Sequence, residues 1–569
     1  MEWNLSLIYE SAEDARRDSE SAVGEARELL EVKVEELDAD GAKDLFEKIE
    51  KVLWKSLLPL QYASLMVSKD SEDKRALKLQ GLFQKNHSEV EQVVSIVRAR
   101  LAKLPLKKLE ELKEIDNYRH VVERIIESKE HTLSEEAEKA LAALSVSRRD
   151  AAAELYERMT SLYTFEIDGK RMTGEEVRAL RYQRNGNLRK RAMRIFLERY
   201  RKDRVIIESL YNTVVRDWDT EAKLRGYEKP ISMRNFENEV DDETVQKLIE
   251  VTTDRYGILQ RYYEWKSKEL GEELTPADVY APVGEVDREF SFEEAEEIVL
   301  RAYYGFSDRV GRIVEEFFEE RRIDAFPKKG KRGGAFCSYS VPNGKPFVLL
   351  NFTGKIRDVM TLAHELGHGV HGVLSSRQTL LNYHTPLTMA EVASVFGEFL
   401  VFDLLKEELK GDEKKAFIAS KIEDTFATMF RQNMFVRFEI RAHELVEKEG
   451  FASFDDLSSI YADELRKMFG NSVRLTREYR DEWSTIPHFF FAPFYVYAYN
   501  FANALVLALY SRYLEEGETF VPKYIKLLES GGKDRPERLL EKVGVKLKDE
   551  KLWEKAFDFL ESMVEEVIS

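Results

Sequence analysis

Residues 364 to 368 read His-Glu-Leu-Gly-His, and this spacing of two histidines and a glutamate is typical of a zinc-binding helix. Residues four apart on an α-helix lie one turn above each other, so His364 and His368 can direct their imidazoles at the same point. Two neutral imidazoles at about 2.0–2.1 Å from the metal supply half of a tetrahedral zinc site. Glu365 follows His364 and can reach a metal-bound water, so we predict that it is the general base.

The residues around this motif favour a metal site over an accidental match. Residues 359–374 carry apolar side chains at helical spacing, which predicts a largely buried helix. Two histidines and a carboxylate in such a helix are costly unless a partner compensates them, and a zinc ion does so. We therefore predict one Zn2+ per chain. A similar run, Arg441 to Glu447, has Glu447 where a second histidine is needed, and we interpret it as a solvated helix face.

A third protein ligand must come from another element, because catalytic zinc sites have three protein ligands and leave the fourth position to water. His371 lies seven residues after His364, about 10 Å along a straight helix at ~1.5 Å per residue, so it cannot reach the same ion. The helix predicted over residues 388–405 carries Glu391 and Glu398, which are seven residues apart and share one face. Spacing leaves both open: one is the ligand, and the other orients a zinc-bound histidine.

Helices make up most of the scaffold that must position these residues. Residues 12–161 show apolar side chains about once per turn, which predicts a series of long amphipathic helices. Pro59 is expected to end or kink one of them. Residues 165–172 predict a small hairpin, with Asp168-Gly169 supplying the positive φ angles of its tight turn.

The one convincing sheet comes directly before the motif helix. Residues 333–341 and 346–353 read as two strands joined by a turn. Such a hairpin has two interpretations. It covers the core, or its edge pairs with an extended peptide and holds the scissile carbonyl over the metal.

Composition narrows the classes of function. The 569 residues include 88 basic and 106 acidic side chains, and the formal charge of −18 argues against nucleic acid or an anionic membrane surface as a partner. No stretch approaches the ~20 apolar residues of a membrane-spanning helix, and the N-terminus lacks the pattern of a signal peptide. Cys337 is the only cysteine, which excludes an intramolecular disulfide and predicts a cytoplasmic location.

The sequence resembles the oligoendopeptidase F branch of the thimet-oligopeptidase-like zinc metallopeptidases. The matching segments are His364 to His368, Ala390 to Glu398, Leu349 to Phe352, Ile486 to Tyr499, Arg225 to Tyr227 and Asp278 to Pro282. The resemblance implies a mostly α-helical, two-lobed body around a deep cleft that admits short peptides, with a small β-sheet beside the zinc-binding helix. The N-terminal helical lobe would cover residues 1–200 and the zinc-dependent catalytic domain residues 201–569.

The resemblance also implies roles for single side chains. Glu391, which begins Glu-x-x-Ser, becomes the third zinc ligand beside His364 and His368. His488, Tyr495 and Tyr499 become active-site groups that stabilise the oxyanion, although their spacing departs from that of thimet oligopeptidase. Tyr495 and Tyr499 are four apart and share a helix face, whereas Tyr497 projects elsewhere.

We therefore expect a zinc metalloendopeptidase, an oligoendopeptidase that hydrolyses short peptides with Glu365 as general base. Two alternatives remain open. A zinc metallo-carboxypeptidase or dipeptidyl carboxypeptidase on a similar helical scaffold would need a basic residue for the terminal carboxylate of its substrate. A non-catalytic helical binding protein would carry the motif by accident and would hold no metal.

Overall fold

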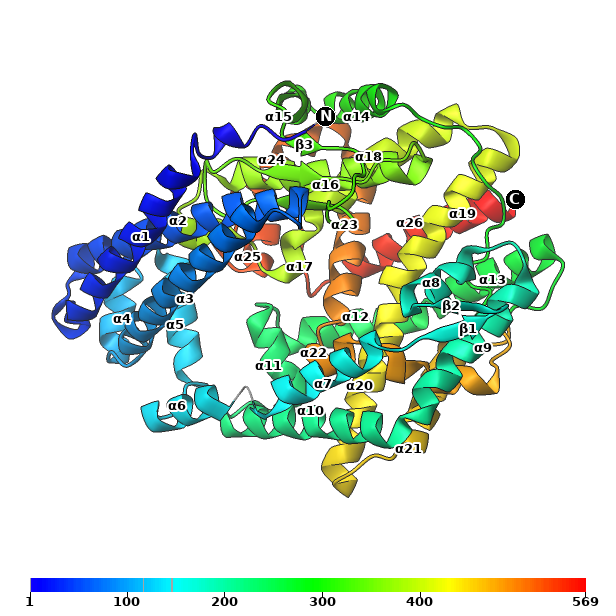
Figure 1. The fold of residues 1–569 in the computed structure, drawn as a ribbon, viewed down its shortest axis with the longest axis horizontal. Coiled ribbons are helices and arrows are strands. Elements are labelled where there is room, and N and C mark those ends of the chain that lie inside the picture. The colour runs from blue at the N-terminus through cyan, green and yellow to red at the C-terminus, as the bar shows by residue number, and fades with distance from the viewer. Residues whose placement is uncertain (1, 116, 145–146) are drawn as a thin grey trace. The chain divides into compact units, whose positions relative to one another are not determined.

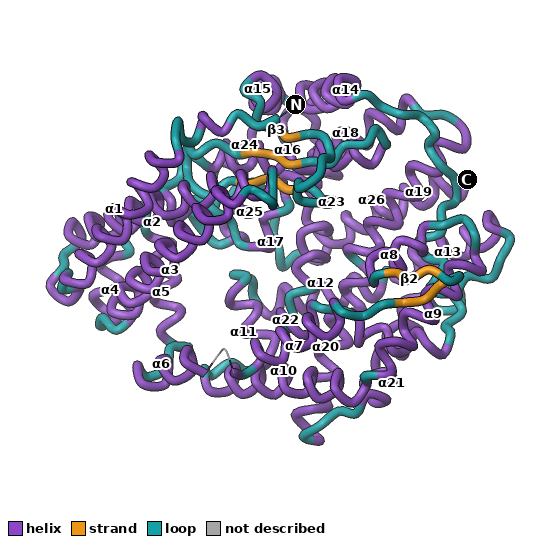
Figure 2. The backbone as a smooth tube through the Cα atoms, viewed as in Figure 1, coloured by secondary structure: helices purple, strands orange, loops and turns teal. Residues whose placement is uncertain are grey.

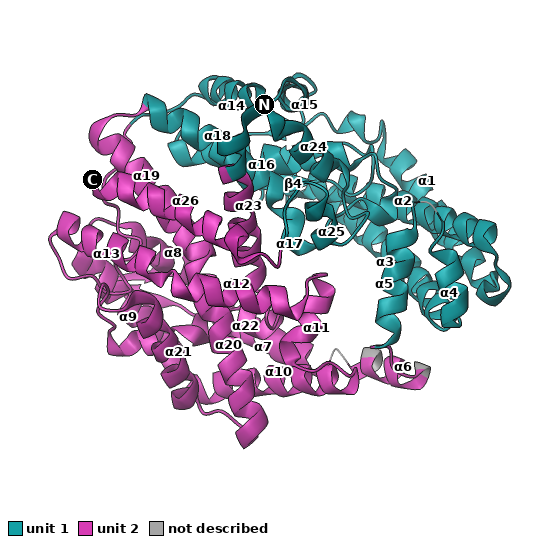
Figure 3. Cartoon of the chain, turned by 180° about the vertical axis from the view of Figure 1, so that it is seen from behind, with its two compact units in different colours: residues 1–130, 288–408, 512–546 teal, residues 131–287, 409–511, 547–569 magenta. Residues whose placement is uncertain are grey.

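The computed structural model describes residues 2–115, 117–144 and 147–569. The chain folds into two compact units, each built from three segments (Figure 3). Unit 1 comprises residues 1–130, 288–408 and 512–546, and unit 2 comprises residues 131–287, 409–511 and 547–569. Helices dominate both units, as predicted, and strands are few and short (Figures 1 and 2). Within the described part of the chain, no helix is long and apolar enough to cross a membrane.

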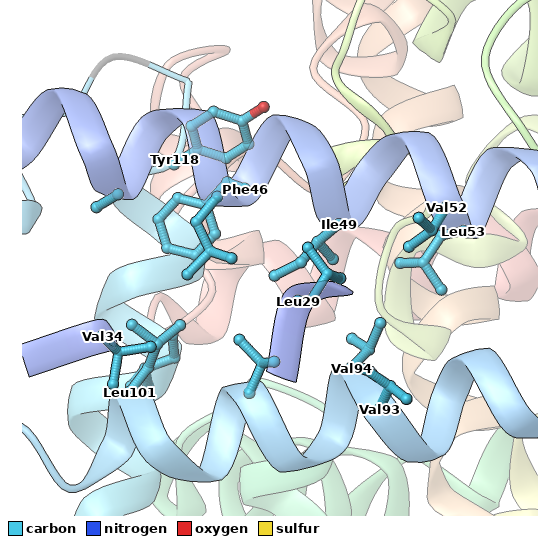
Figure 4. Packing of buried hydrophobic residues seen from close by; sticks show 14 of the residues in the cluster. Leu29, Val34, Phe46, Ile49, Val52, Leu53, Val93, Val94, Leu101 and Tyr118 are labelled. Carbon is cyan, nitrogen blue, oxygen red and sulfur yellow. The ribbon is translucent and has the colours of Figure 1, made fainter. Parts of the chain in front are cut away.

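Unit 1 begins with a bundle of long helices, α1 (Ala12–Glu28), α2 (Ala39–Lys69) and α3 (Lys74–Ala102). Their apolar faces meet in one buried cluster (Figure 4), to which α2 contributes Phe46, Ile49 and Leu53. Pro59 was expected to end or kink this helix, and it does not end it, because α2 continues ten residues beyond Pro59, to Lys69. Residues on both sides of Pro59 are buried, and this packing maintains the helix across the missing donor.

The sheet of unit 1 has three strands in the order β3 (Ile323–Asp324), β5 (Phe347–Leu349), β4 (Phe336–Ser338). The predicted hairpin is confirmed, because β4 and β5 are antiparallel with Cys337 opposite Val348. Each strand has three residues and is much shorter than the predicted 333–341 and 346–353. The sequence did not reveal β3, a two-residue strand that pairs with β5 in parallel. β5 is buried throughout, and the chain passes from it into the motif helix.

The remaining helices of unit 1 include the motif helix itself. They are α4 (Leu106–Leu112), α5 (Arg119–Lys129), α14 (Phe292–Phe306), α15 (Asp308–Glu319), α16 (Ile356–Ser375), α17 (Leu387–Ala390), α18 (Val392–Glu408), α24 (Val521–Glu529) and α25 (Pro536–Glu541).

Unit 2 contains the predicted hairpin, β1 (Phe165–Ile167) and β2 (Lys170–Met172), with Asp168 at φ +52° and Gly169 at φ +76°. Its helices are α6 (Glu135–Leu144), α7 (Arg149–Ser161), α8 (Gly174–Ala179), α9 (Gly186–Lys202), α10 (Arg204–Leu224), α11 (Pro230–Glu237), α12 (Asp242–Asp254), α13 (Tyr256–Leu270), α19 (Gly411–Thr428), α20 (Phe430–Glu449), α21 (Phe454–Phe469), α22 (His488–Phe491), α23 (Tyr497–Glu516) and α26 (Glu550–Ile568). From Arg512 on, α23 belongs to unit 1.

The interpretation of residues 441–447 as a solvated helix face is wrong for its histidine. His443 on α20 is only 3% exposed, and its Nδ1 lies 2.6 Å from Oδ1 of Asp219. The neighbouring Glu444 and Glu447 are exposed, as expected. Helix α20 therefore has one buried face. This face is hard to recognise in the sequence, because charged residues separate its apolar positions.

Candidate active site

Helix α16 presents His364 and His368 to the same point. Its N-terminus is fixed by Asp358, whose carboxylate accepts hydrogen bonds from the backbone N–H groups of Thr353 and Lys355. Apolar side chains on its other faces are buried and anchor the helix in unit 1. The two imidazoles project from one face, with ring centroids 4.9 Å apart and ring planes at 82°. This is the arrangement that the spacing of four residues predicted.

Helix α18 packs directly against α16 (Figure 1). It carries Glu398, and Glu391 comes directly before its first residue. Contact this close requires glycine on both helices. A Cβ at Gly367 would lie 2.5 Å from the carbonyl oxygen of Ala393, and a Cβ at Gly397 would lie 3.3 Å from the carbonyl oxygen of Ala363. The Gly397 Cβ would also lie 1.9 Å from Oη of Tyr303 on α14. That hydroxyl instead donates a hydrogen bond of 2.7 Å to the carbonyl of Ala363, one residue before the first histidine. The two glycines thus bring α18 within reach of the imidazoles.

Glu391 lies where the chain passes from α17 to α18, with φ −89° and ψ 0°. The helix predicted over residues 388–405 is therefore interrupted at this residue. Ser394 Oγ donates a hydrogen bond of 2.6 Å to Glu391 Oε2, which lies 3.5 Å from His364 Nε2 and 3.4 Å from His368 Nε2. Ligand atoms of the two histidines and Glu391 all lie within 4.8 Å of one another. A donor set of two imidazoles and one carboxylate at this separation fits zinc.

Glu398 occupies the other side of the His364 ring, with Oε1 2.5 Å from Nδ1. The two glutamates that spacing left open thus contact different nitrogens of one imidazole. Glu391 lies near Nε2 of His364 and Nε2 of His368, the two nitrogens that converge. Glu398 lies at Nδ1 of His364, which points away from them. This geometry supports Glu391 as the ligand and Glu398 as the orienting partner, an assignment that remains a prediction.

Charges around the histidines favour a cation at this point. Although burial lowers the pKa of His364, the hydrogen bond and charge of Glu398 and the charge of Glu391 raise it to about 9. Although burial raises the pKa of Glu391, contacts with His368, His364 and Ser394 lower it to about 2. Carboxylates that stabilise an imidazolium ion here would also stabilise a metal cation.

Glu365, the predicted base, is 7% exposed. Burial raises its pKa, and the charges of His364 and His368 partly offset this effect. The nearby backbone of Cys337 also lowers the pKa. Cys337 is the central residue of β4, and this strand packs against α16, so it lies beside the carboxylate. A carboxylate with a raised pKa suits a group that takes up and returns a proton.

His371 lies outside the group of possible metal ligands, as the rise along the helix predicted. It is 4% exposed, and its Nδ1 is buried with no hydrogen-bond partner among the described residues. Burial lowers the pKa of His371 to about 3, so the ring is neutral.

A second group of possible ligand atoms, from His120, Glu123 and Asp534, also lies within 4.8 Å. Side-chain cations already neutralise its carboxylates. Arg538 lies 2.7 Å from Glu123 and 3.2 Å from Asp534, and Lys542 lies 2.9 Å from Asp534. We interpret this group as an ion-pair network between two segments of unit 1.

The other predicted site residues belong to unit 2, where they lie next to one another. The rings of His488 and Tyr495 are nearly parallel, with centroids 6.0 Å apart and planes at 13°. Tyr499 Oη lies 3.4 Å from His488 Nε2. All three side chains are at least partly exposed. Tyr497 points elsewhere: it is fully buried, and its hydroxyl accepts a hydrogen bond of 2.9 Å from Asn238 Nδ2.

Several contributing residues are not evident from the sequence. Ser394 stands out there only within Glu-x-x-Ser, and that spacing is the one signal for its bond to Glu391. Gly367, Gly397 and Tyr303 gave no signal, because each acts through a neighbour that is distant in sequence.

Comparison with known proteins gives matches along most of the chain. Residues 179–559 match the family described as Peptidase family M3, and residues 101–165 match the one described as Oligopeptidase F. An Oligoendopeptidase F homolog of Borreliella burgdorferi is 29% identical, and the alignment covers 99% of this chain and 97% of the relative. Oligopeptidase PepF of Bacillus subtilis is 28% identical over 84% of this chain and 72% of its own length.

Solved structures share the fold. The oligoendopeptidase-F structure from Enterococcus faecium superposes with a TM-score of 0.71 at 22% identity, covering 98% of this chain and 97% of that one. A crystal structure from Chlamydophila abortus reaches a TM-score of 0.91 at 22% identity, covering 100% of this chain and 97% of that one. At this identity the structures support the mostly helical architecture alone.

Proposed function

Because the chain belongs to peptidase family M3, as the motif resemblance predicted, we propose that this peptidase is a zinc-dependent endopeptidase of short peptides. The observation that carries the proposal is the convergence of His364, His368 and Glu391, whose ligand atoms lie within 4.8 Å, with Glu365 next in sequence. The names of the relatives, an oligoendopeptidase and an oligopeptidase, support short peptides as substrates.

His364, His368 and Glu391 would hold the zinc ion, which when bound supplies Lewis-acid activation of water and of the peptide carbonyl. Glu398 accepts a hydrogen bond from the Nδ1–H group of His364. This bond keeps the proton on Nδ1 and leaves the lone pair of Nε2 free for the metal. Glu365 takes a proton from the attacking water and then delivers a proton to the leaving amine nitrogen. Its burial supports this role, because a desolvated carboxylate is a stronger base.

We assign the orientation of the substrate to β4. In the sheet order β3-β5-β4 this strand is at the edge, and within the described residues it pairs with β5 alone. An extended peptide that adds to such an edge is held by backbone hydrogen bonds, which suits substrates of varied sequence. The contact from Cys337 to Glu365 supports this interpretation over a hairpin that only covers the core.

We assign stabilisation of the developing oxyanion to His488, Tyr495 and Tyr499. Imidazole and phenol groups are suitable hydrogen-bond donors, and their mutual contacts support a joint role. Cys337 is a free thiol, which supports a cytoplasmic location for the enzyme.

The test is Glu365→Gln with blocked peptides and metal analysis. The wild-type protein should hold one zinc ion and cleave fluorogenic peptides whose two termini are blocked, and a chelator should abolish cleavage. Glu365→Gln should keep the zinc but lose several orders of magnitude in kcat. Cleavage only of peptides with a free C-terminus would instead indicate a carboxypeptidase. A purified wild-type protein that takes up no zinc would indicate a non-catalytic binding protein.

A further inference from the structure

The turn between α22 and α23 contains a strained residue. Phe494 has φ +58° and, among the described non-glycine residues with positive φ, it is the only aromatic one. This region of backbone space is unfavourable for a bulky side chain and persists only where the surroundings enforce it. The strain lies directly before Tyr495, one of the proposed oxyanion donors, and after the helix that begins with His488.

Two side chains hold the peptide group that precedes Phe494. Its carbonyl oxygen, that of Pro493, accepts a hydrogen bond of 3.1 Å from Arg234 Nε. Its N–H, that of Phe494, donates a hydrogen bond of 2.8 Å to Glu439 Oε1. Rotation of this peptide by a half turn would return Phe494 to negative φ, but it would break both bonds. Arg234 and Glu439 therefore bind the two opposite edges of one peptide group, its C=O and its N–H.

Each of these side chains is itself fixed. Glu439 on α20 is 1% exposed, and its Oε2 is buried without a hydrogen-bond partner among the described residues, so the bond to Phe494 is its main compensation. Arg234 on α11 pairs with Glu237, and its guanidinium lies over the Trp218 ring at 4.9 Å.

The side chain of Phe494 is packed as well as its backbone. Its ring centroid lies 4.4 Å from that of His443, which Asp219 holds at 2.6 Å, and 6.5 Å from that of Trp218. The turn is thus restrained on its backbone and on its ring. This packing also gives the buried face of α20 a purpose that the sequence did not indicate.

The turn sets the direction of Tyr495. The N–H of Tyr495 donates a hydrogen bond of 3.0 Å to the carbonyl of Ala492, and its ring lies parallel to that of His488. We infer that Arg234 and Glu439 are positioning residues, which hold the Pro493–Phe494 peptide in the orientation that places Tyr495 against His488. The expected effect on catalysis rests on the proposed function of Tyr495 and His488. The claim that Arg234 and Glu439 hold the peptide in this orientation does not rest on it.

The chemistry of Glu439 selects the informative variants. Its role needs an acceptor oxygen, which both the ionised and the neutral carboxyl provide, and burial raises the pKa of Glu439 to about 8. Gln keeps this acceptor, whereas Leu has a similar size and lacks it. Arg234→Met keeps the aliphatic stem over Trp218 and removes the donor to Pro493. Because the Arg234 side chain is 13% exposed, whereas Glu439 is 1% exposed, this variant also covers the case that Glu439→Leu does not fold.

The experiment measures kcat and KM on a blocked fluorogenic peptide in the wild type and in a Tyr495→Phe background. Glu439→Leu and Arg234→Met should each lower kcat at least tenfold in the wild type, with KM changed less than threefold and zinc content unchanged. Glu439→Gln should keep at least half of kcat, and Glu444→Gln, at an exposed position of the same helix, should be unaffected. In the Tyr495→Phe background both damaging substitutions should cost less than twofold, because their effect passes through Tyr495.

Undiminished losses in the Tyr495→Phe background, or wild-type kcat in both Glu439→Leu and Arg234→Met, would overturn the inference. A wild type that cleaves no peptide would refute the proposed function instead. A crystal structure of Glu439→Leu decides the geometric claim in either case. Negative φ at Phe494 with a displaced Tyr495 ring supports the inference, and an unchanged turn refutes it.

Discussion

Glu398 Oε1 lies 2.5 Å from Nδ1 of His364, on the far side of the ring from the point where the imidazoles converge. A carboxylate at Nδ1 retains the proton on that nitrogen and leaves the lone pair of Nε2 available to a metal. The same carboxylate restricts rotation of the ring. Glu398 on α18 therefore holds His364 in the orientation and protonation state that a metal ligand needs.

Substitution of Glu398 by alanine should weaken zinc binding about 10- to 100-fold, the usual effect of removing a group that orients a metal ligand. Chelator competition measures the zinc affinity directly, without a substrate. Glu407→Ala is the matched control, because Glu407 lies on the same helix and is exposed. Equal affinity in the Glu398 variant and the control would contradict the orienting role.

Gly367 should not tolerate a methyl group. In Gly367→Ala the new Cβ would meet the Ala393 carbonyl oxygen at 2.5 Å, so α18 must move away from α16. We expect a loss of about 1–3 kcal/mol in the free energy of unfolding, typical of overpacking, together with weaker zinc binding. Urea unfolding measures the stability, and chelator competition measures the affinity.

The control for this substitution is Gly305→Ala on α14. A Cβ at Gly305 has nothing within 4 Å, so the substitution should be neutral or slightly stabilising through higher helix propensity. A Gly367→Ala protein as stable as the control would show that the helices do not need glycine at their contact.

Local patterns predicted those parts of the site that depend on a single helix. The convergence of His364 and His368 and the exclusion of His371 follow from the pitch and rise of α16. The hairpin of β4 and β5 followed from its strand and turn residues. Each of these features is set by residues that are close in sequence.

Features that depend on two distant segments were not predictable from spacing. Glu391 and Glu398 both fall within reach of His364, and only packing against α16 shows which nitrogen each one meets. Spacing also could not show the interruption at Glu391, because the residues around it favour a helix. His443 was misread for the same reason, since its partner Asp219 lies 224 residues away.

The tyrosines of residues 495–499 should separate into two classes. Tyr497→Phe loses a buried hydrogen bond with Asn238 and should cost about 1 kcal/mol of stability with kcat unchanged. Tyr495→Phe and Tyr499→Phe should leave stability within about 0.5 kcal/mol, since both side chains are partly exposed. Each should lower kcat by roughly 10²–10³, the typical effect of losing an oxyanion donor.

Thermal unfolding and steady-state kinetics on the three variants test this division. Tyr497→Phe serves as the matched control, because it removes the same atom from the same segment. Full activity in both Tyr495→Phe and Tyr499→Phe would leave the oxyanion role to His488 alone. A large loss of kcat in Tyr497→Phe would contradict the assignment of its hydroxyl to the core.

Glu439 should make the stability of the protein depend on pH. Burial raises the pKa of Glu439 to about 8, from an ordinary value of 4.5, and the Phe494 N–H and Arg234 offset only part of this effect. The folded state thus keeps its proton to higher pH than the unfolded state. Its contribution to stability is complete below pH about 4.5 and is lost as the pH rises toward 8. The gap between the two pKa values corresponds to at most about 5 kcal/mol.

Glu439→Gln removes this titration, because the amide stays neutral while it still accepts the Phe494 N–H. We expect the stability of this variant relative to the wild type to increase steadily between pH 5 and pH 8. Urea unfolding of the zinc-loaded proteins at several pH values measures the difference, with Glu444→Gln as an exposed control on the same helix. Parallel pH dependence in the wild type and Glu439→Gln would mean that Glu439 is ionised in the folded protein, which would contradict the raised pKa.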